Sequence, residues 1–278
     1  MIDSHCHLDD PRFAPDFEAM LGRARAVGVR DFVLAGVSPA GWNAQEALCR
    51  AHQGLWLTIG LHPWICAHAA DDGPDGEEAL LDALERRLEK PLDETPRLAP
   101  VAVGEIGLHR TGDSGDETLA RQERLFRSQL RLAKQHALPV VLHVLRAHER
   151  ALVILREEGV PARGGVLHSY SGAAALVPAY AALGLSFSFT GPVTYANARR
   201  PIEAVRVVPG DRLLVETDAP DQMPQIARVE RDAACGPPRN EPANLPLVVD
   251  AIARARGEAP AEIARRTTEN ARRLFGIG

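Results

Sequence analysis

The sequence predicts an α/β fold, a single (β/α)8 TIM-type barrel that spans residues 1–278 as one domain. Eight short apolar runs rich in β-branched residues alternate with stretches that have the apolar periodicity of helices. Alternating strands and helices form parallel sheets, and eight strands close into a barrel. The 278 residues are enough for two average domains, but α/β barrels of about 250 residues fold as one.

Each predicted strand is a short apolar run that ends where polar residues, Gly or Pro begin. Parallel strands of this kind are buried on both faces, which accounts for their continuous hydrophobicity. In chain order the eight are Met1–Leu8, Val29–Val37, Leu55–Leu61, Val101–Leu108, Pro139–Val144, Gly165–Tyr170, Leu185–Thr190 and Leu213–Thr217.

Helical periodicity fills the intervals between these strands. Ser38, directly before Pro39, is typical of a capping hydroxyl followed by proline in the first turn, and Ser171 is expected to cap a later helix. The predicted helices are Asp16–Val27, Pro39–His52, Gly76–Glu89, Asp116–His136, Ala147–Glu158, Gly172–Leu183, Asn197–Val207, Pro242–Ala255 and Pro260–Phe275. Two long loops, Trp64–Asp75 and Ala219–Glu241, follow strands and therefore belong to the catalytic face of a barrel.

An open, doubly wound sheet is the alternative fold. It is expected to carry a Gly-rich turn after its first strand, where backbone amides hold a pyrophosphate. Here the first strand is followed by LDDPRFAPD, which contains no glycine. The barrel is therefore favoured.

Composition excludes several classes of protein. The N-terminus MIDSHCHLDD has no basic start and no apolar core of signal-peptide length, so a cytoplasmic location is expected. No apolar run approaches the roughly 18 residues that span a bilayer, and the four cysteines show no disulfide framework. The net charge of −5 argues against a polyanion binder by bulk charge, so a nucleic-acid substrate needs a local source of positive potential.

Histidines and carboxylates fall at the C-terminal ends of five predicted strands. Because strand side chains alternate, His5 and His7 are expected to point together into the barrel, while Cys6 points toward the helices. One such histidine is usually a capping or supporting group, but coincidence across five strands favours a shared metal site. Imidazoles and carboxylates together suit divalent ions. The six candidate ligands are His5, His7, Glu105, His143, His168 and Asp218.

These residues lie in segments that resemble the TatD family of metal-dependent deoxyribonucleases, within the amidohydrolase superfamily. The resemblance covers nearly the whole chain, and the ordered set is far more specific than any one motif. The matching segments are IDSHCHLD at the start, TIGLHPW at 58–64, AVGEIGL at 102–108, LPVVLHV at 138–144, VLHSYSG at 166–172, LLVETDAP at 213–220 and RNEPANL at 239–245.

The resemblance implies two divalent ions. One would be held by His5, His7 and Asp218, the other by His143 and His168, and Glu105 would bridge them. It implies hydrolysis of a DNA phosphodiester by metal-activated water, with Asp218 as the proton acceptor. His62 resembles a family histidine near the substrate phosphate, although a cap on its loop is the alternative. Imidazole-rich sites suit Zn²⁺ or Mn²⁺, whereas the family is described as Mg²⁺-dependent, so the ion stays open.

Two positions depart from the family pattern. His109 stands where GEIGLD has a carboxylate, and Leu145 stands where an arginine is common, with Arg146 next to it. Neither departure is expected to touch the metal ligands. Both bear on phosphate contacts and substrate preference.

Three functions are compatible with such a site. A nuclease that attacks single-stranded or frayed DNA ends is favoured, because the chain lacks the basic stripe that duplex binding needs. Trp64, Tyr170 and Tyr195 are candidates to stack a terminal base or to pack at the rim. A related hydrolase of an amide, lactone or phosphotriester often bridges its metals with a carboxylated lysine on strand four, where this chain has Glu105. A non-catalytic metal-holding barrel would need no base, but Asp218 provides one. No membrane or protein partner is predicted.

Overall fold

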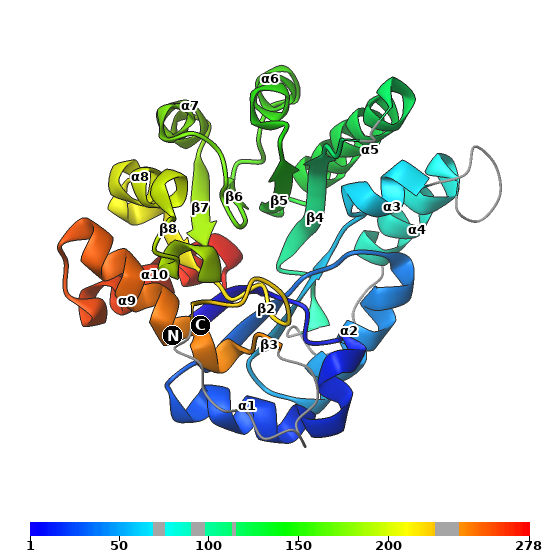
Figure 1. Cartoon of the computed structure of the whole chain (residues 1–278). Helices are drawn as coiled ribbons and strands as arrows, with labels where there is room; N and C mark the ends of the chain where they lie inside the picture. The colour runs from blue at the N-terminus through cyan, green and yellow to red at the C-terminus, as the bar shows by residue number, and fades with distance from the viewer. Residues whose placement is uncertain (69–75, 90–97, 113–114, 226–238) are drawn as a thin grey trace.

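The computed structural model describes residues 1–68, 76–89, 98–112, 115–225 and 239–278. Eight parallel strands form one sheet in chain order, so the predicted barrel is confirmed (Figure 1). Parts of the two predicted loops, 69–75 and 226–238, lie outside the described residues. The strands are β1 Ile2–Cys6, β2 Asp31–Leu34, β3 Leu55–Ile59, β4 Ala102–His109, β5 Val140–Leu145, β6 Gly165–Leu167, β7 Leu185–Phe189 and β8 Leu213–Val215.

The α-helices lie around the sheet, as the alternating pattern predicts (Figure 1). Residues 63–68, at the start of a predicted loop, instead form a short helix, because Pro63 fits the first turn of a helix. The helices are α1 Phe17–Ala26, α2 Pro39–Ala51, α3 Pro63–His68, α4 Glu77–Glu89, α5 Asp116–Gln135, α6 His148–Glu158, α7 Val177–Ala182, α8 Arg199–Val207, α9 Leu245–Arg256 and α10 Pro260–Phe275. Short 3-10 helices include η3 Ala174–Leu176 and η4 Gly191–Thr194.

The two predicted helix caps have different outcomes. The Ser38 hydroxyl accepts a hydrogen bond from the Gly41 backbone N–H at 3.4 Å, so that cap is confirmed. Ser171 caps no helix, because η3 begins only at Ala174 and α7 at Val177. Pro178 is compatible with the first turn of a helix but not with its interior, which places the start of α7 late.

The seam between β8 and β1 closes the barrel through bonds at its mouth. The Asp218 N–H donates to the His5 carbonyl at 3.0 Å. The carboxylate of Asp3, fully buried on β1, accepts the Thr217 N–H at 2.9 Å. The end of β8 is therefore held directly against the strand that carries His5.

The apolar core has two parts. Inside the barrel a small cluster joins strand residues such as Ile2 and Val141 to Phe275 and Ile277 of the C-terminal segment. A larger cluster lies between the outer face of the sheet and the helices, and it includes Cys6. Because α10 packs against β1 and β8 beneath the barrel interior, the opposite end is left for polar residues.

Three cysteines, Cys6, Cys49 and Cys66, are buried free thiols, and Cys235 lies outside the described residues. No helix in the described part of the chain combines the length and the apolar character that crossing a bilayer requires. That residues 1–278 form one domain stays a prediction.

Candidate metal centre

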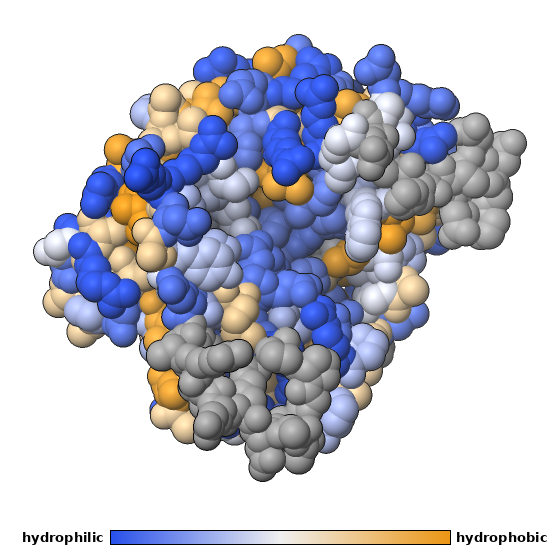
Figure 2. Space-filling view, viewed as in Figure 1, coloured by the Kyte–Doolittle hydropathy of each residue, from blue (hydrophilic) through white to orange (hydrophobic). Residues whose placement is uncertain are grey.

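The six predicted ligands lie together at the C-terminal mouth of the barrel. Figure 2 shows a hollow with hydrophilic residues near the centre of the face in view. A cavity of about 650 Å³ at this mouth is lined by five of the six and by His62. Cys6 belongs to the cluster beneath the helices, so its predicted orientation toward the helices is confirmed.

Two strand irregularities bring ligands to the barrel axis. In the β1–β2 pair Asp3 lies opposite Phe32 and Cys6 opposite Leu34, so β1 holds one extra residue between them. The β4–β5 pair has the same irregularity between Val103 and Ile106. Such bulges turn a side chain that regular alternation would place differently. His5 lies in the first bulge and Glu105 in the second.

One group of ligand atoms suits a divalent ion. His5, Glu105, His168 and Asp218 each offer an atom, and these atoms all lie within 4.8 Å of one another. His5 Nε2 and Glu105 Oε1 contact each other, yet neither makes a hydrogen bond of good geometry within the described part of the chain. His7 Nε2 lies 3.3 Å from Asp218 Oδ1. Buried donors that converge without hydrogen bonds fit a metal site.

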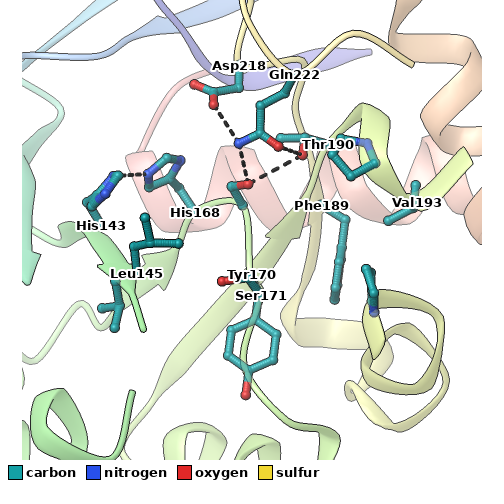
Figure 3. Close-up of a pocket in the computed structure, with 14 residues that line it drawn as sticks. His143, Leu145, His168, Tyr170, Ser171, Phe189, Thr190, Val193, Asp218 and Gln222 are labelled. Carbon is teal, nitrogen blue, oxygen red and sulfur yellow. Dashed lines mark hydrogen bonds between the residues drawn. The ribbon is translucent and has the colours of Figure 1, made fainter. Parts of the chain in front are cut away.

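A second group lies on the other side of Glu105. His62, His109 and His143 each offer an atom there, and these atoms all lie within 4.8 Å of one another. His143 Nδ1 is 3.8 Å from Glu105 Oε2 and 2.9 Å from His168 Nε2, which itself lies 3.7 Å from Glu105 Oε1. Figure 3 shows the contact between His143 and His168. The two oxygens of Glu105 therefore face different sets of imidazoles. This arrangement suits a carboxylate that bridges two ions.

The charges of the site also favour cations. Burial opposes ionisation of Glu105, but the surrounding imidazoles hold its pKa well below the usual value. Burial likewise opposes ionisation of Asp218, whose pKa is lowered by His7 and His168. Burial disfavours the cationic forms of His7 and His168, but the carboxylates raise the pKa of His7 to about 9 and that of His168 to about 10. Divalent ions would supply the positive charge that these carboxylates stabilise.

His62 is suited to donate a hydrogen bond rather than to bind a metal. Its Nδ1 accepts the Trp64 backbone N–H at 3.0 Å, so the ring proton sits on Nε2. That Nε2 lies 3.1 Å from Glu105 Oε2. Burial lowers the pKa of His62 to about 4, which keeps the ring neutral. The capping alternative is also realised, because Nδ1 holds the start of α3.

Glu216, fully buried, supports His168 and was missed by sequence reasoning. Its Oε1 accepts the Ser169 N–H at 2.7 Å and lies 3.5 Å from His168 Nδ1, which leaves Nε2 of that ring facing the ligands. Its Oε2 accepts the Ser188 hydroxyl at 2.5 Å. An acidic residue inside the apolar run LLVET is the signal that could have identified it.

Gln222, the second missed residue, holds Asp218. Its amide nitrogen donates to Asp218 Oδ2 at 2.8 Å and to Ser169 Oγ at 2.6 Å, while its oxygen accepts from Thr190 (Figure 3). One Asp218 oxygen is thereby fixed and the other faces His7. Nothing in the loop sequence distinguishes this glutamine.

Comparison with known proteins agrees with this geometry. A model of the family described as TatD related DNase matches residues 2–276. The chain belongs to this family. It is a metal-dependent hydrolase, as predicted.

Individual relatives above 30% identity support the assignment, and a more distant structure shares the fold. The "3'-5' ssDNA/RNA exonuclease TatD" of Cronobacter sakazakii is 37% identical over 280 residues, with 99% of this chain and 97% of the relative covered. The "Uncharacterized metal-dependent hydrolase YabD" of Bacillus subtilis is 32% identical over 277 residues, covering 100% and 99%. The crystal structure of YjjV, a TatD homologue from Escherichia coli, has a TM-score of 0.86, 32% identity and coverage of 100% and 98%. An E. coli phosphotriesterase homology protein, at 16% identity and a TM-score of 0.65 with coverage of 99% and 98%, shares the fold.

One departure from the TatD pattern does touch a predicted ligand. His109 Nδ1 lies 3.0 Å from His143 Nε2, and the two rings stack with 8° between their planes. The expectation that neither departure reaches the ligands is therefore wrong for His109. His109, the last residue of β4, pairs in register with Leu145, and Gly107 pairs with His143, so His109 lies close to His143 across the two strands. The imidazole thus fixes the orientation of His143.

The second departure and the aromatic candidates also have definite places. Leu145 lines a cavity beside the metal centre, whereas Arg146 is exposed and belongs to neither cavity described at the mouth. Tyr170 is buried, and its hydroxyl donates to the Ala173 carbonyl. Trp64 is 62% exposed and lines the cavity of about 650 Å³, whereas Tyr195, 40% exposed, lines neither cavity and donates its hydroxyl to the Met223 carbonyl.

Proposed function

We propose that this TatD-family hydrolase cleaves phosphodiester bonds at the ends of single-stranded nucleic acid, DNA above all, with two divalent ions. The observation that carries the proposal is Glu105, whose Oε1 contacts His5 while its Oε2 faces His143. His5, His7 and Asp218 would hold one ion and His143 and His168 the other. When bound, such a pair acidifies water and neutralises charge on phosphate oxygens.

Residues of the chain provide the remaining functions. Asp218, with Oδ2 fixed by Gln222, directs its other oxygen into the site and is placed to accept a proton from water. The neutral His62 would donate a hydrogen bond from its Nε2–H to a phosphate oxygen. The proton accepted by Asp218 then goes to the sugar oxygen released when the P–O bond breaks, so the hydrolysis balances.

The charge of the mouth supports a strand end as the substrate. The cavity of about 650 Å³ at the mouth is called the open cavity from here on. Among the described residues that line it there is no lysine or arginine, and Asp9, Asp10 and Asp221 lie there. Arg12 at the rim is engaged by Asp10 and Asp221. Positive potential would therefore be confined to the ions, which favours capture of one phosphate over tracking of a long backbone. Relatives named as ssDNA/RNA exonucleases agree with this proposal.

The test compares an open with a closed strand. Labelled linear single-stranded DNA and a closed circle of equal length are incubated with protein loaded with Mg²⁺, Mn²⁺ or Zn²⁺, beside RNA and duplex DNA. We expect stepwise terminal products from the open strand and slow attack on the circle. Equal rates on both would show an endonuclease. Cleavage of lactones or amides but of no nucleic acid would reject the proposal.

A further inference from the structure

A second, more enclosed cavity opens from the metal centre between the ends of β5–β8. It measures about 270 Å³ and shares His143, His168 and Asp218 with the open cavity (Figure 3). A group bound at these three shared residues would therefore be in contact with both cavities. The volume lies just below the range of about 300–1,000 Å³ that holds drug-sized ligands, so it suits one small ring system.

Away from the metal ligands, much of the wall of this cavity is apolar. No lysine or arginine lines it among the residues that the structure describes, and Asp218 is its one carboxylate. A second phosphate would meet no cation there, whereas a flat, uncharged ring would bury both faces. The apolar lining consists of Val144, Leu145, Tyr170, Phe189, Pro192, Val193 and Pro201.

Polar groups line one side of the cavity. Ser169, Thr190 and Gln222 form a hydrogen-bonded chain that ends on Asp218 Oδ2. Phe189 and Thr190 are almost fully buried, which fixes this wall before any ligand binds. A cavity with an apolar slot and a few placed hydrogen-bonding groups is typical of sites for small heterocycles.

We propose that this cavity, here called the base pocket, receives the nucleobase of the 3′-terminal nucleotide while its phosphodiester lies at the metal ligands; the 3′ end is chosen because relatives are named 3'-5' exonucleases. The proposal rests on the nuclease function proposed above and adds where the terminal nucleoside lies. The rest of the strand leaves through the open cavity, because only that one is wide, and exposed Trp64 lies along its path.

The test removes one base at a time from a dinucleotide. Thymidylyl-thymidine is compared with analogues in which a tetrahydrofuran sugar replaces either the 3′-terminal or the 5′ nucleoside. Loss of the 3′ base should lower kcat/KM at least about tenfold, in line with stacking and burial of one base. Loss of the 5′ base should have a smaller effect. Equal rates for all three, or a larger loss with the 5′ change, would overturn the base pocket.

A variant links the effect to the cavity. Leu145, partly buried in the wall, is replaced by tryptophan to fill the pocket, and Val153→Trp, on the exposed face of α6, is the matched control. L145W should cleave the intact dinucleotide only as fast as it cleaves the 3′-abasic analogue. The kcat/KM of L145W for that analogue should stay within about twofold of the wild-type value. A uniform loss on both substrates would count against the proposal.

Binding provides a readout that needs no turnover. Thymidine 5′-monophosphate should bind the metal-loaded protein at least about tenfold more tightly than 2-deoxyribose 5-phosphate, and L145W should abolish the difference. Equal affinities in wild type overturn the base pocket, even if cleavage of DNA is observed. Failure to cleave any phosphodiester overturns the proposed function, and the base pocket with it.

Discussion

At the residue scale, the centre depends on one carboxylate that faces two sets of imidazoles. Glu105 is 2% exposed, and its neighbours hold its pKa low, so it is a fixed negative charge rather than a proton carrier. Asp218 has a different place, with one oxygen bound to Gln222 and the other near His7. Replacing each carboxylate by a neutral amide should therefore have a different effect on ion binding.

This difference can be measured with isosteric amides. Glu105→Gln should lose ions from both positions, whereas Asp218→Asn should keep at least the ion between His143 and His168. Each should lower kcat by at least about 10²-fold, Asp218→Asn because it loses the general base and Glu105→Gln because it loses the ions. Metal content by elemental analysis separates the two variants, and Asp116→Asn, exposed at the start of α5, is the control. Near-normal turnover with ions in place would show the assigned role to be wrong.

The sequence indicates the candidate ligands more readily than the residues that hold those ligands in place. The gathering of the six candidate ligands at the mouth could be predicted because chemistry-bearing side chains at strand ends stand out against apolar runs. Glu216 and Gln222 act through contacts with Ser169 and His168, about fifty residues away in sequence, and no local pattern encodes such a contact. The stacking of His109 on His143 likewise depends on the register between β4 and β5.

At the scale of elements, the two ends of the barrel have different tasks. The N-terminal end is closed by α10, whose Phe275 is 2% exposed and packs with Ile2 and Val141. The predicted bounds of α10 agree with the structure, and those of α7 do not. A long amphipathic pattern identifies α10, whereas the short segment around Pro178 gives no clear starting point. The bulges in β1 and β4 also have no signature in the sequence.

Separation of the two ends predicts a selective effect of a core mutation. Phe275→Ala removes a buried ring and should lower the free energy of unfolding by about 3–5 kcal/mol. Affinity for the ions should change little, because the space that the Phe275 ring leaves lies at the N-terminal end of the barrel, away from the mouth. Denaturant unfolding and metal titration test this. Leu247→Ala, at an exposed position of α9, is the control and should change the free energy of unfolding by no more than about 0.5 kcal/mol. A parallel loss of metal affinity would contradict the separation.

At the scale of the whole molecule, stability and function share the β8–β1 seam. The bonds that close the barrel there, from Asp218 to the His5 carbonyl and from Thr217 to Asp3, join residues that flank or form the metal site. Most buried apolar side chains lie elsewhere, between the sheet and its helices. Ions that bind the folded chain should therefore stabilise it without being required for folding.

Removal of the ions tests this coupling. A ligand present at a hundred times its Kd stabilises the folded state by about 2.7 kcal/mol, and in a chain of this size each kcal/mol shifts Tm by about 2–4 °C. Chelation should accordingly lower Tm by about 5–10 °C for each tightly bound ion and leave the far-ultraviolet circular dichroism intact below the transition. Glu105→Gln, which lacks the bridge, should show little response to chelator or to added ions. Loss of secondary structure on chelation would show that the ions are needed to fold the barrel, and an unchanged Tm in wild type would show that no ion binds at the mouth.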